Sequence, residues 1–490
     1  MKKIISLVMV LAMLVGVLAG CGGGSSDVSL TEDPNVCPED AYEINWYLMA
    51  DPQTDVHSVE EKVNEYLKDK INATVKITCL SSAQYKQKMG TMINANEYFD
   101  LCFVSRWMLD YVNNSRSGAF CALNDYFDTY LKDIISEYSQ EVIDCSSVDG
   151  TLYALPVNKE MATQYGWVYR KDLADKYGID MTQYKSFEEL EPVLKLIKEN
   201  EPDIKYPMDW SSDTAPERLY VYEKFIYKDG TYPDDHTVNV YETPKFKKAC
   251  ETARDFYEKG YVRPDVLTAT DMLQRMQSGK TFVILQSLKP GKAKELFKES
   301  AYEFEQAEVT EPIIDYLAGT GSMQAISSTS KNPARVARFL NLLNTDPYLK
   351  NLIVHGIEGK HYKKIDENTV EPIPNSGYDL YSVSWAIGNV FLDYLTPSEE
   401  PDKLARLKEF NDSAKTAKVN KFILPENDER DRKLSEISKV AAKYKNQLIM
   451  GVVDPDTTLP EFISALDDVG IDDMLEEIQT EYEAYLKTLK

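Results

Sequence analysis

The spacing of hydrophobic residues alternates between two periods in the N-terminal part of the chain. In "DVHSVEEKVNEYLKDK" (residues 55–70) apolar residues recur every three to four positions, which predicts an amphipathic helix. In "ATVKITC" (73–79) they alternate with polar residues, a pattern typical of a strand. Further strands are predicted over 43–50 and 99–105, with a second helix before the later one. This order indicates a parallel α/β lobe.

A second set of elements begins after a stretch in which a glycine-containing turn and Pro156 interrupt the pattern of helices and strands. "SFEELEPVLKLIKEN" (186–200) opens with Ser186 and Glu189 as a capping box and then carries apolar residues on one face, which predicts a helix. Helices are also predicted over 243–260 and 271–280, and a buried strand over 281–287. These elements indicate a second lobe.

The chain then returns towards the first lobe. A Gly- and Ser-rich stretch precedes a helix for which Asn332 is the predicted N-cap and Pro333 the first residue. We therefore expect the chain to cross between the lobes near 156–166 and again near 312–322. From about residue 371 an aromatic-rich stretch is followed by predicted helices over 428–448 and 471–489.

The extreme N-terminus has the pattern of a secretory signal. Lys2 and Lys3 precede an apolar run that ends at Gly20 and is shorter than the ~20 residues that cross a bilayer. Leu18-Ala19-Gly20-Cys21 resembles the lipobox of bacterial lipoproteins, in which the cysteine is acylated. We expect a signal peptide over 1–20, an acylated Cys21 with a flexible linker over 21–40, and a position on the extracytoplasmic face of the cell membrane. An ordinary cleaved signal with a chance cysteine is the alternative.

Composition and charge narrow the range of partners. The 490 residues suffice for two or three domains of ~150 residues, and the hydrophobic share of 43% suffices for packed cores. The formal net charge of −25 disfavours nucleic acid and anionic lipid surfaces. A neutral or cationic solute is the partner that this charge favours.

No motif of metal binding or catalysis is present. The six cysteines beyond Cys21 lack zinc-site spacing, and the four histidines have no ligand frame, so we expect neither a metal nor a cofactor. Whether those cysteines form disulfides stays open. The GxSxG, HExxH and Walker motifs are missing, which argues against an enzyme. A glycoside hydrolase needs only two carboxylates, however, and 80 acidic residues leave that alternative open.

Several segments together resemble a known family: "INWYL", "YALPVNKE", "GSMQAISSTSKNPARVARFLNLLNTDPYL", "GIEGKHY" and "DPDTTLPEFISAL". The chain resembles the family 1 extracellular solute-binding proteins of ABC importers, and within them the LplA-like lipoprotein subgroup with an uncharacterised C-terminal extension. The resemblance implies an α/β, two-lobed periplasmic-binding-protein fold with an interlobe hinge. It places the first lobe at 41–158 plus 320–370, the second at 159–319, and a largely helical extension that packs on the lobes at 371–490.

A sugar-binding site needs flat aromatic side chains for the apolar ring faces and polar groups for the hydroxyls. Trp46, Tyr47 and Trp107 follow predicted strands, where ligands of open α/β sheets lie, although core packing explains them equally well. Trp210 lies in a polar loop of the second lobe. The complete set of candidate ligand-binding residues is Trp46, Tyr47, Asp51, Arg106, Trp107, Asn158, Lys159, Trp210, Tyr316, Trp385 and Asn389.

The sequence and the resemblance together predict a lipid-anchored, monomeric receptor rather than an enzyme. It would capture a small solute, for which we expect an oligosaccharide, and deliver it to an ABC permease. Two alternatives stay open: a surface carbohydrate-active hydrolase, and a receptor of the same fold for peptides or amino sugars.

Overall fold

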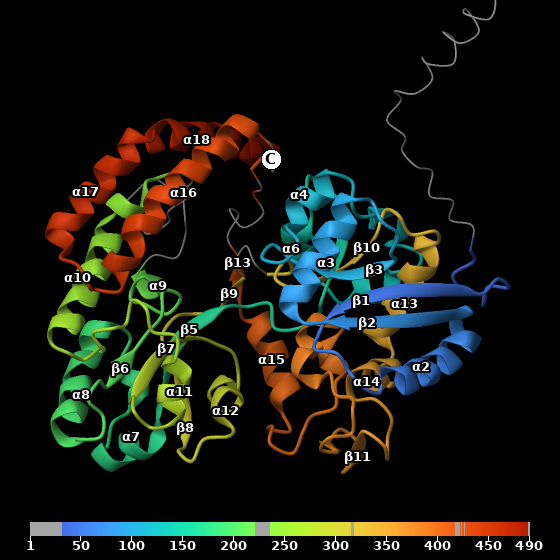
Figure 1. Cartoon of the computed structure of the whole chain (residues 1–490), viewed down its shortest axis with the longest axis horizontal. Helices are drawn as coiled ribbons and strands as arrows, with labels where there is room; N and C mark the ends of the chain where they lie inside the picture. The colour runs from blue at the N-terminus through green and yellow to red at the C-terminus, as the bar shows by residue number, and fades with distance from the viewer. Residues whose placement is uncertain are drawn as a thin grey trace, which may run out of the picture.

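Two α/β lobes and a C-terminal set of helices make up the chain (Figure 1). The computed structural model describes residues 32–220, 236–314, 318–416, 422, 424–425 and 427–488. The strand order is β2-β1-β3-β10-β4 in the sheet of the first lobe and β6-β7-β5-β8 in the sheet of the second.

The first sheet combines parallel and antiparallel pairs. β1 runs parallel to β2 and β3, whereas β10 is antiparallel to both β3 and β4. Its strands are β1 (Tyr42–Met49), β2 (Ala73–Leu80), β3 (Leu101–Val104), β4 (Ala154–Pro156) and β10 (Met323–Ile326). The helices of this lobe are α2 (Val56–Ile71), α3 (Ser82–Asn94), α4 (Tyr111–Arg116), α5 (Lys132–Ile135), α6 (Gln140–Ser146), α13 (Pro333–Thr345) and α14 (Pro347–His355).

The local signals of this lobe act as the sequence predicts. Val59, Val63 and Leu67 form the buried stripe of α2, because residues three and four apart share one face of a helix. Asn332 caps α13 by accepting a hydrogen bond from the backbone N–H of Arg335 at 3.0 Å, and Pro333 takes the first helical position.

The second lobe has a smaller sheet around β5. Its strands are β5 (Gln164–Arg170), β6 (Met208–Asp209), β7 (Val283–Leu288) and β8 (Phe304–Glu308). Its helices are α7 (Lys171–Tyr177), α8 (Phe187–Asn200), α9 (Glu217–Tyr220), α10 (Pro244–Glu258), α11 (Met272–Gln277) and α12 (Lys292–Phe297). The Ser186 hydroxyl accepts from the Glu189 N–H at 3.2 Å, so α8 has the predicted N-cap.

The C-terminal part of the chain contacts both lobes. Tyr378, Leu380 and Ala386 belong to the core of the first lobe, where the short helix η4 (Tyr381–Ala386) lies. Helices α16 (Asp428–Ile449), α17 (Pro455–Asp468) and α18 (Ile471–Thr488) instead bury apolar residues in the core of the second lobe, beside α10 (Figure 1). The hairpin of β11 (Tyr362–Lys364) and β12 (Val370–Pro372) precedes η4 in the chain. The turn η5 (Val390–Leu392) and α15 (Lys403–Asp412) lie between η4 and α16.

The chain passes between the two sheets at adjacent places. The first passage leads from β4 to β5 through 157–163, and the second leads from β9 (Ile313–Ile314) to β10. Both lie where the sequence predicts crossings. A third passage follows α15, because β13 (Lys415–Thr416) pairs in parallel with β9.

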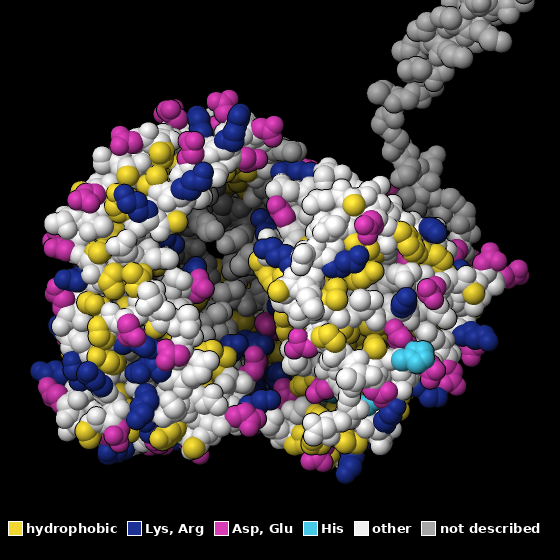
Figure 2. Space-filling model, in the orientation of Figure 1, with side chains coloured by type: hydrophobic (Ala, Val, Ile, Leu, Met, Phe, Trp, Pro, Cys, Tyr) yellow, Lys and Arg dark blue, Asp and Glu magenta, His cyan; other side chains and the backbone are white. Residues whose placement is uncertain are grey.

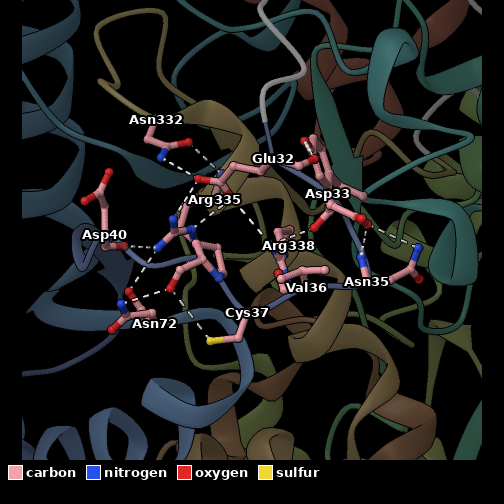
Figure 3. Close-up of polar contacts among 12 residues, drawn as sticks. Glu32, Asp33, Asn35, Val36, Cys37, Asp40, Asn72, Asn332, Arg335 and Arg338 are labelled. Atoms are coloured by element: carbon pink, nitrogen blue, oxygen red, sulfur yellow. Dashed lines mark hydrogen bonds and ion pairs between the residues drawn. The ribbon is translucent and has the colours of Figure 1, made fainter.

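The first described residues form a strap across α13 (Figure 3). Arg335 is buried and donates two hydrogen bonds to the Glu32 carboxylate, at 2.7 and 3.0 Å. Its third nitrogen donates to the carbonyl oxygens of Asp40 and Asn72 at 3.0 and 2.9 Å. This one guanidinium therefore joins the strap, the start of β1 and the end of α2.

Replacing Arg335 tests the strap. Arg335→Met removes one partner of a buried ion pair, and we expect a loss of about 3 kcal/mol in the free energy of unfolding, measured by urea denaturation. Lys62→Met is the matched control, because the Lys62–Glu65 pair is exposed on both sides and should contribute about 0.5 kcal/mol or less. Equal losses in the two variants would contradict a stabilising role of the strap.

The same contact predicts a dependence of stability on pH. Burial opposes ionisation of Glu32, but hydrogen bonds from Arg335 and Asn332 outweigh it and lower the pKa of Glu32 below its ordinary value of 4.5. A carboxyl whose pKa is lower in the folded state stabilises the fold at any pH above its unfolded-state pKa. This stabilisation is lost as the pH falls through the folded-state pKa. Glu32→Gln should therefore be less stable than wild type at pH 7, and thermal unfolding curves of the two proteins should converge under acid conditions. A stability difference that stays constant down to pH 3 would argue against this role.

Candidate functional site

A pocket of 390 Å³ lies between the lobes. The second lobe contributes Lys289, Pro290 and Gly291, which directly follow β7, together with residues of α12. The opposite wall is built by η4, by the stretch after it and by α15. The carboxyl end of a strand is where α/β sheets present their ligand-binding loops, so this position suits a binding site. In the space-filling view the surface is hollowed between the two halves of the molecule (Figure 2).

Two tryptophans lie together at one side of this pocket. The ring centroids of Trp107 and Trp385 are 6.2 Å apart, and both rings contact the buried Phe103 at 5.8 and 5.9 Å. Trp385 lines the pocket, and Trp107 is 49% exposed. The Trp107 indole N–H donates to the Gly321 carbonyl at 2.8 Å, which leaves the ring faces for apolar contact.

A set of paired charges joins the lobes at the pocket. Lys289 lies 3.3 Å from Glu160 and 3.0 Å from Glu295, and Lys159 lies 3.7 Å from Glu160. Burial opposes ionisation of Glu160, but the two ammonium groups outweigh it and lower the pKa of Glu160 to about 2. Lys159 and Glu160 belong to the first passage between the lobes. Opening of the lobes would therefore act directly on this network.

The opposite wall carries a second paired group. Tyr381 donates to the Glu399 carboxylate at 2.6 Å, and Lys403 of α15 approaches the other carboxylate oxygen at 2.5 Å. Burial opposes ionisation of Glu399, but these two partners outweigh it and lower the pKa of Glu399. Across the pocket, Lys294 of α12 forms an ion pair with Glu400 and so links the two walls.

Some of the predicted residues come together here. Trp107, Trp385 and Lys159 lie at or beside the interlobe pocket, and Arg106 precedes Trp107 and donates its backbone N–H to the Thr320 carbonyl at 3.2 Å. A smaller pocket of 190 Å³ is lined by Lys159, Glu160 and Gly321, so it connects the charged network to the carbonyl that holds Trp107.

The predictions for Trp46 and Trp210 are wrong. Trp46 is 0% exposed and packs edge-to-face on Phe339, with its indole N–H bonded to the Gln324 side chain at 3.1 Å. Trp210 is 1% exposed and packs between Phe187 and Phe256. Both rings fill the cores of their lobes, because burial of so much apolar surface strongly stabilises a fold.

Four further candidates, all within the described ranges, do not line the interlobe pocket. Tyr47 packs on Phe99 at 6.4 Å, and Asp51 is exposed to solvent after β1. Asn389 caps η5 and donates to the Asn344 carbonyl, and it also lines the separate pocket to which Asn158 belongs. Asn158 lines a separate pocket of 590 Å³ beside α15. Tyr316 lies outside the described residues.

Sequence reasoning missed the second-lobe wall and the groups on η4. Lys289 stands directly after the predicted strand 281–287, so the rule that selected Trp107 would have found it as well. Tyr381 and Glu399 carry no such signal. Their place depends on how the C-terminal part of the chain folds back onto the first lobe.

The described residues offer neither a metal site nor a membrane span. Within the described ranges, no group of three or more His, Cys, Asp or Glu side chains is arranged to hold a metal ion. No described helix is long and apolar enough to span a membrane.

The fold is shared with known proteins. The structure of the N-glycan transport solute binding protein NgtS from Streptococcus pneumoniae matches with a TM-score of 0.80 and 27% identity, over 91% of this chain and 100% of that one. Its complex with Man5GlcNAc matches with a TM-score of 0.67 and 28% identity, over 91% and 99%. This likeness confirms the expected two-lobed α/β fold.

The sequence comparisons agree. A carbohydrate ABC transporter substrate-binding protein of Streptococcus pneumoniae serotype 4 is 28% identical over 98% of this chain and 97% of its own length. A domain of unknown function (DUF3502) matches residues 425–487, which include α16, α17 and α18. The model of the bacterial extracellular solute-binding proteins matches residues 50–350, more than half of the chain. The chain therefore belongs to this family of extracellular solute-binding proteins.

Proposed function

We propose that this chain binds a neutral oligosaccharide in the interlobe pocket and delivers it to an ABC importer. The observation that carries the proposal is the Trp107–Trp385 pair at the edge of a pocket that two lobes share and that charged and hydroxyl groups help to line. Indole faces stack on the apolar faces of sugar rings, and hydroxyl groups need nearby donors and acceptors. Lys159, Glu160, Lys289 and Tyr381 are the polar groups that we assign to this task.

The paired charges favour a neutral ligand over a peptide or an amino sugar. Glu160 lies between two lysines, and Glu399 lies between Tyr381 and Lys403. A cationic ligand would have to replace partners that are already in place, at a cost in desolvation. The relative NgtS is named for N-glycan transport and has been crystallised with Man1GlcNAc and Man5GlcNAc. We therefore propose a mannose- and GlcNAc-containing oligosaccharide.

A movement of the lobes would tell the permease that a ligand is bound. One structure of NgtS matches this chain with a TM-score of 0.80, whereas the complexes with Man1GlcNAc and Man5GlcNAc match with 0.70 and 0.67. The structures of this one protein therefore differ in how closely they resemble this chain. We propose that the lobes are arranged differently in these structures. A ligand that contacts both walls would favour the closed arrangement, which the permease would then recognise.

Two carboxylates of the pocket, Glu160 and Glu399, do not suit the role of the acid in a hydrolase. Glycoside hydrolysis requires one carboxylic acid that stays protonated near neutral pH through a raised pKa. Glu160 and Glu399 both have lowered pKa values, so both are ionised. We therefore propose that the ligand is released unchanged.

The organisation of the chain completes the proposal. We assign the first lobe to 41–158 plus 320–370, the second to 159–319, and the extension to 371–490. The extension contributes η4 to the first core and α16 to α18 to the second, which supports a role in holding the lobes at the hinge. Cys21, outside the described residues, is proposed as the acylated anchor of a monomer on the outer face of the cell membrane.

Removing the tryptophans tests the pocket. We expect Trp107→Ala and Trp385→Ala each to weaken the binding of Man5GlcNAc by about tenfold, which is about 1.4 kcal/mol, in isothermal titration calorimetry. Tyr348→Ala is the control, since Tyr348 is equally exposed but lies on α14 outside the pocket. The ligand recovered after prolonged incubation should be intact. Wild-type affinity in the double tryptophan variant would exclude this pocket.

The anchor is tested separately. With Cys21→Ser, the protein should move from the membrane fraction to the medium, because a cleaved chain without acyl groups has nothing to hold it. Detergent phase partitioning of cells that express each form measures this. A variant that stays with the membrane would contradict acylation at Cys21.

A further inference from the structure

A buried ion pair lies in the pocket wall that carries Trp385, and its Asp393 member belongs to the pocket lining. The Lys350 ammonium group of α14 is 0% exposed and lies 3.1 Å from a carboxylate oxygen of Asp393. It donates to the Ser384 hydroxyl at 2.7 Å and also to the Ile387 carbonyl. Ser384 in turn donates to the other carboxylate oxygen of Asp393. These contacts form one closed network.

Stability alone is a poor reason for this network. Burial lowers the pKa of Lys350 and raises the pKa of Asp393, so the site disfavours both charges. Well-packed apolar side chains at such positions are often at least as stable as the ion pair. The network therefore calls for a second explanation, which its location suggests.

The network holds both ends of the turn that carries Trp385. Ser384 precedes the tryptophan, and the Ile387 carbonyl closes the turn, so the single ammonium group of Lys350 bridges residues 384 and 387. The middle of the turn is held from the first sheet, where Ser322 donates to the Trp385 carbonyl at 2.7 Å and Gln324 donates to the Ala386 carbonyl.

The other ring, that of Trp107, is held by the same segment of the chain, residues 321–324. Trp107 donates to the carbonyl of Gly321, the residue before Ser322. The distance between the two indoles therefore depends on contacts to 321–324 and on the hold that Lys350 exerts from the other side. A binding surface fixed before the ligand arrives saves the free energy of ordering it on binding.

We propose that Lys350, with Asp393, is a positioning residue that fixes the 384–387 turn so that Trp385 stands against Trp107 as a ready-made platform for the ligand. This inference deepens the proposed function and rests on it for its consequence in binding. The arrangement of the two rings, however, is measurable without any ligand.

Exciton coupling between the two indoles reports their arrangement. Two rings 6.2 Å apart and tilted by 38° couple strongly in circular dichroism, and subtraction of the Trp385→Ala spectrum isolates that signal. Lys350→Met/Asp393→Leu removes both charges together and should unfold at nearly the wild-type temperature. We expect it to lose most of the coupling signal and about tenfold in affinity for Man5GlcNAc.

A milder variant covers the case in which the double variant fails to fold. Ser384→Ala keeps the Lys350–Asp393 pair but frees one end of the turn, and it should lower the coupling signal and weaken binding about threefold. Arg335→Met, at the strap far from the turn, is the control that loses stability but keeps the signal. An unchanged signal in both the double variant and Ser384→Ala would overturn the inference. A third outcome is possible. If the Lys350→Met/Asp393→Leu variant loses the signal while the Trp107→Ala/Trp385→Ala variant binds like wild type, the positioning role is supported and the proposed pocket is overturned.

Discussion

The insertion of β10 between β3 and β4 is the constraint on which the rest of the structure depends. The strand belongs to a part of the chain that has already built the second lobe, yet its backbone hydrogen bonds are completed only in the first sheet. The two passages between the lobes therefore start side by side and form a hinge. β13 adds a third passage through its pairing with β9.

The same strand organises the binding wall. Gln324 receives the Trp46 indole and donates to the Ala386 carbonyl, so one buried amide joins the core of the first lobe to the turn of η4. The adjoining Ser322 and Gly321 hold Trp385 and Trp107. Because the second passage and the tryptophan pair share this segment, the proposed function predicts that movement of the lobes acts on the surface that contacts the ligand.

Electrostatic pairing at the pocket supports the proposed preference for a neutral ligand. The protein is strongly acidic, yet three carboxylates at the interlobe pocket each have a lysine partner: Glu160 has Lys289, Glu399 has Lys403 and Glu400 has Lys294. Such a pocket presents many hydrogen-bonding groups but little unbalanced charge. A neutral, hydroxyl-rich solute meets that condition better than an ion, since it needs hydrogen-bond partners without displacing an existing ion pair.

The sequence by itself determined the local elements, both return points of the chain and the family, because periodicity, capping residues and strand patterns are local signals. It selected Trp107 and Trp385 but also Trp46 and Trp210. The local sequence around a tryptophan at a strand end or in a polar loop looks the same whether its ring faces a cleft or a core. Only the tertiary structure separated them. Burial of Trp210 depends on Phe187 and Phe256, and exposure of Trp107 depends on Gly321, contacts between residues far apart in the chain that no local pattern records.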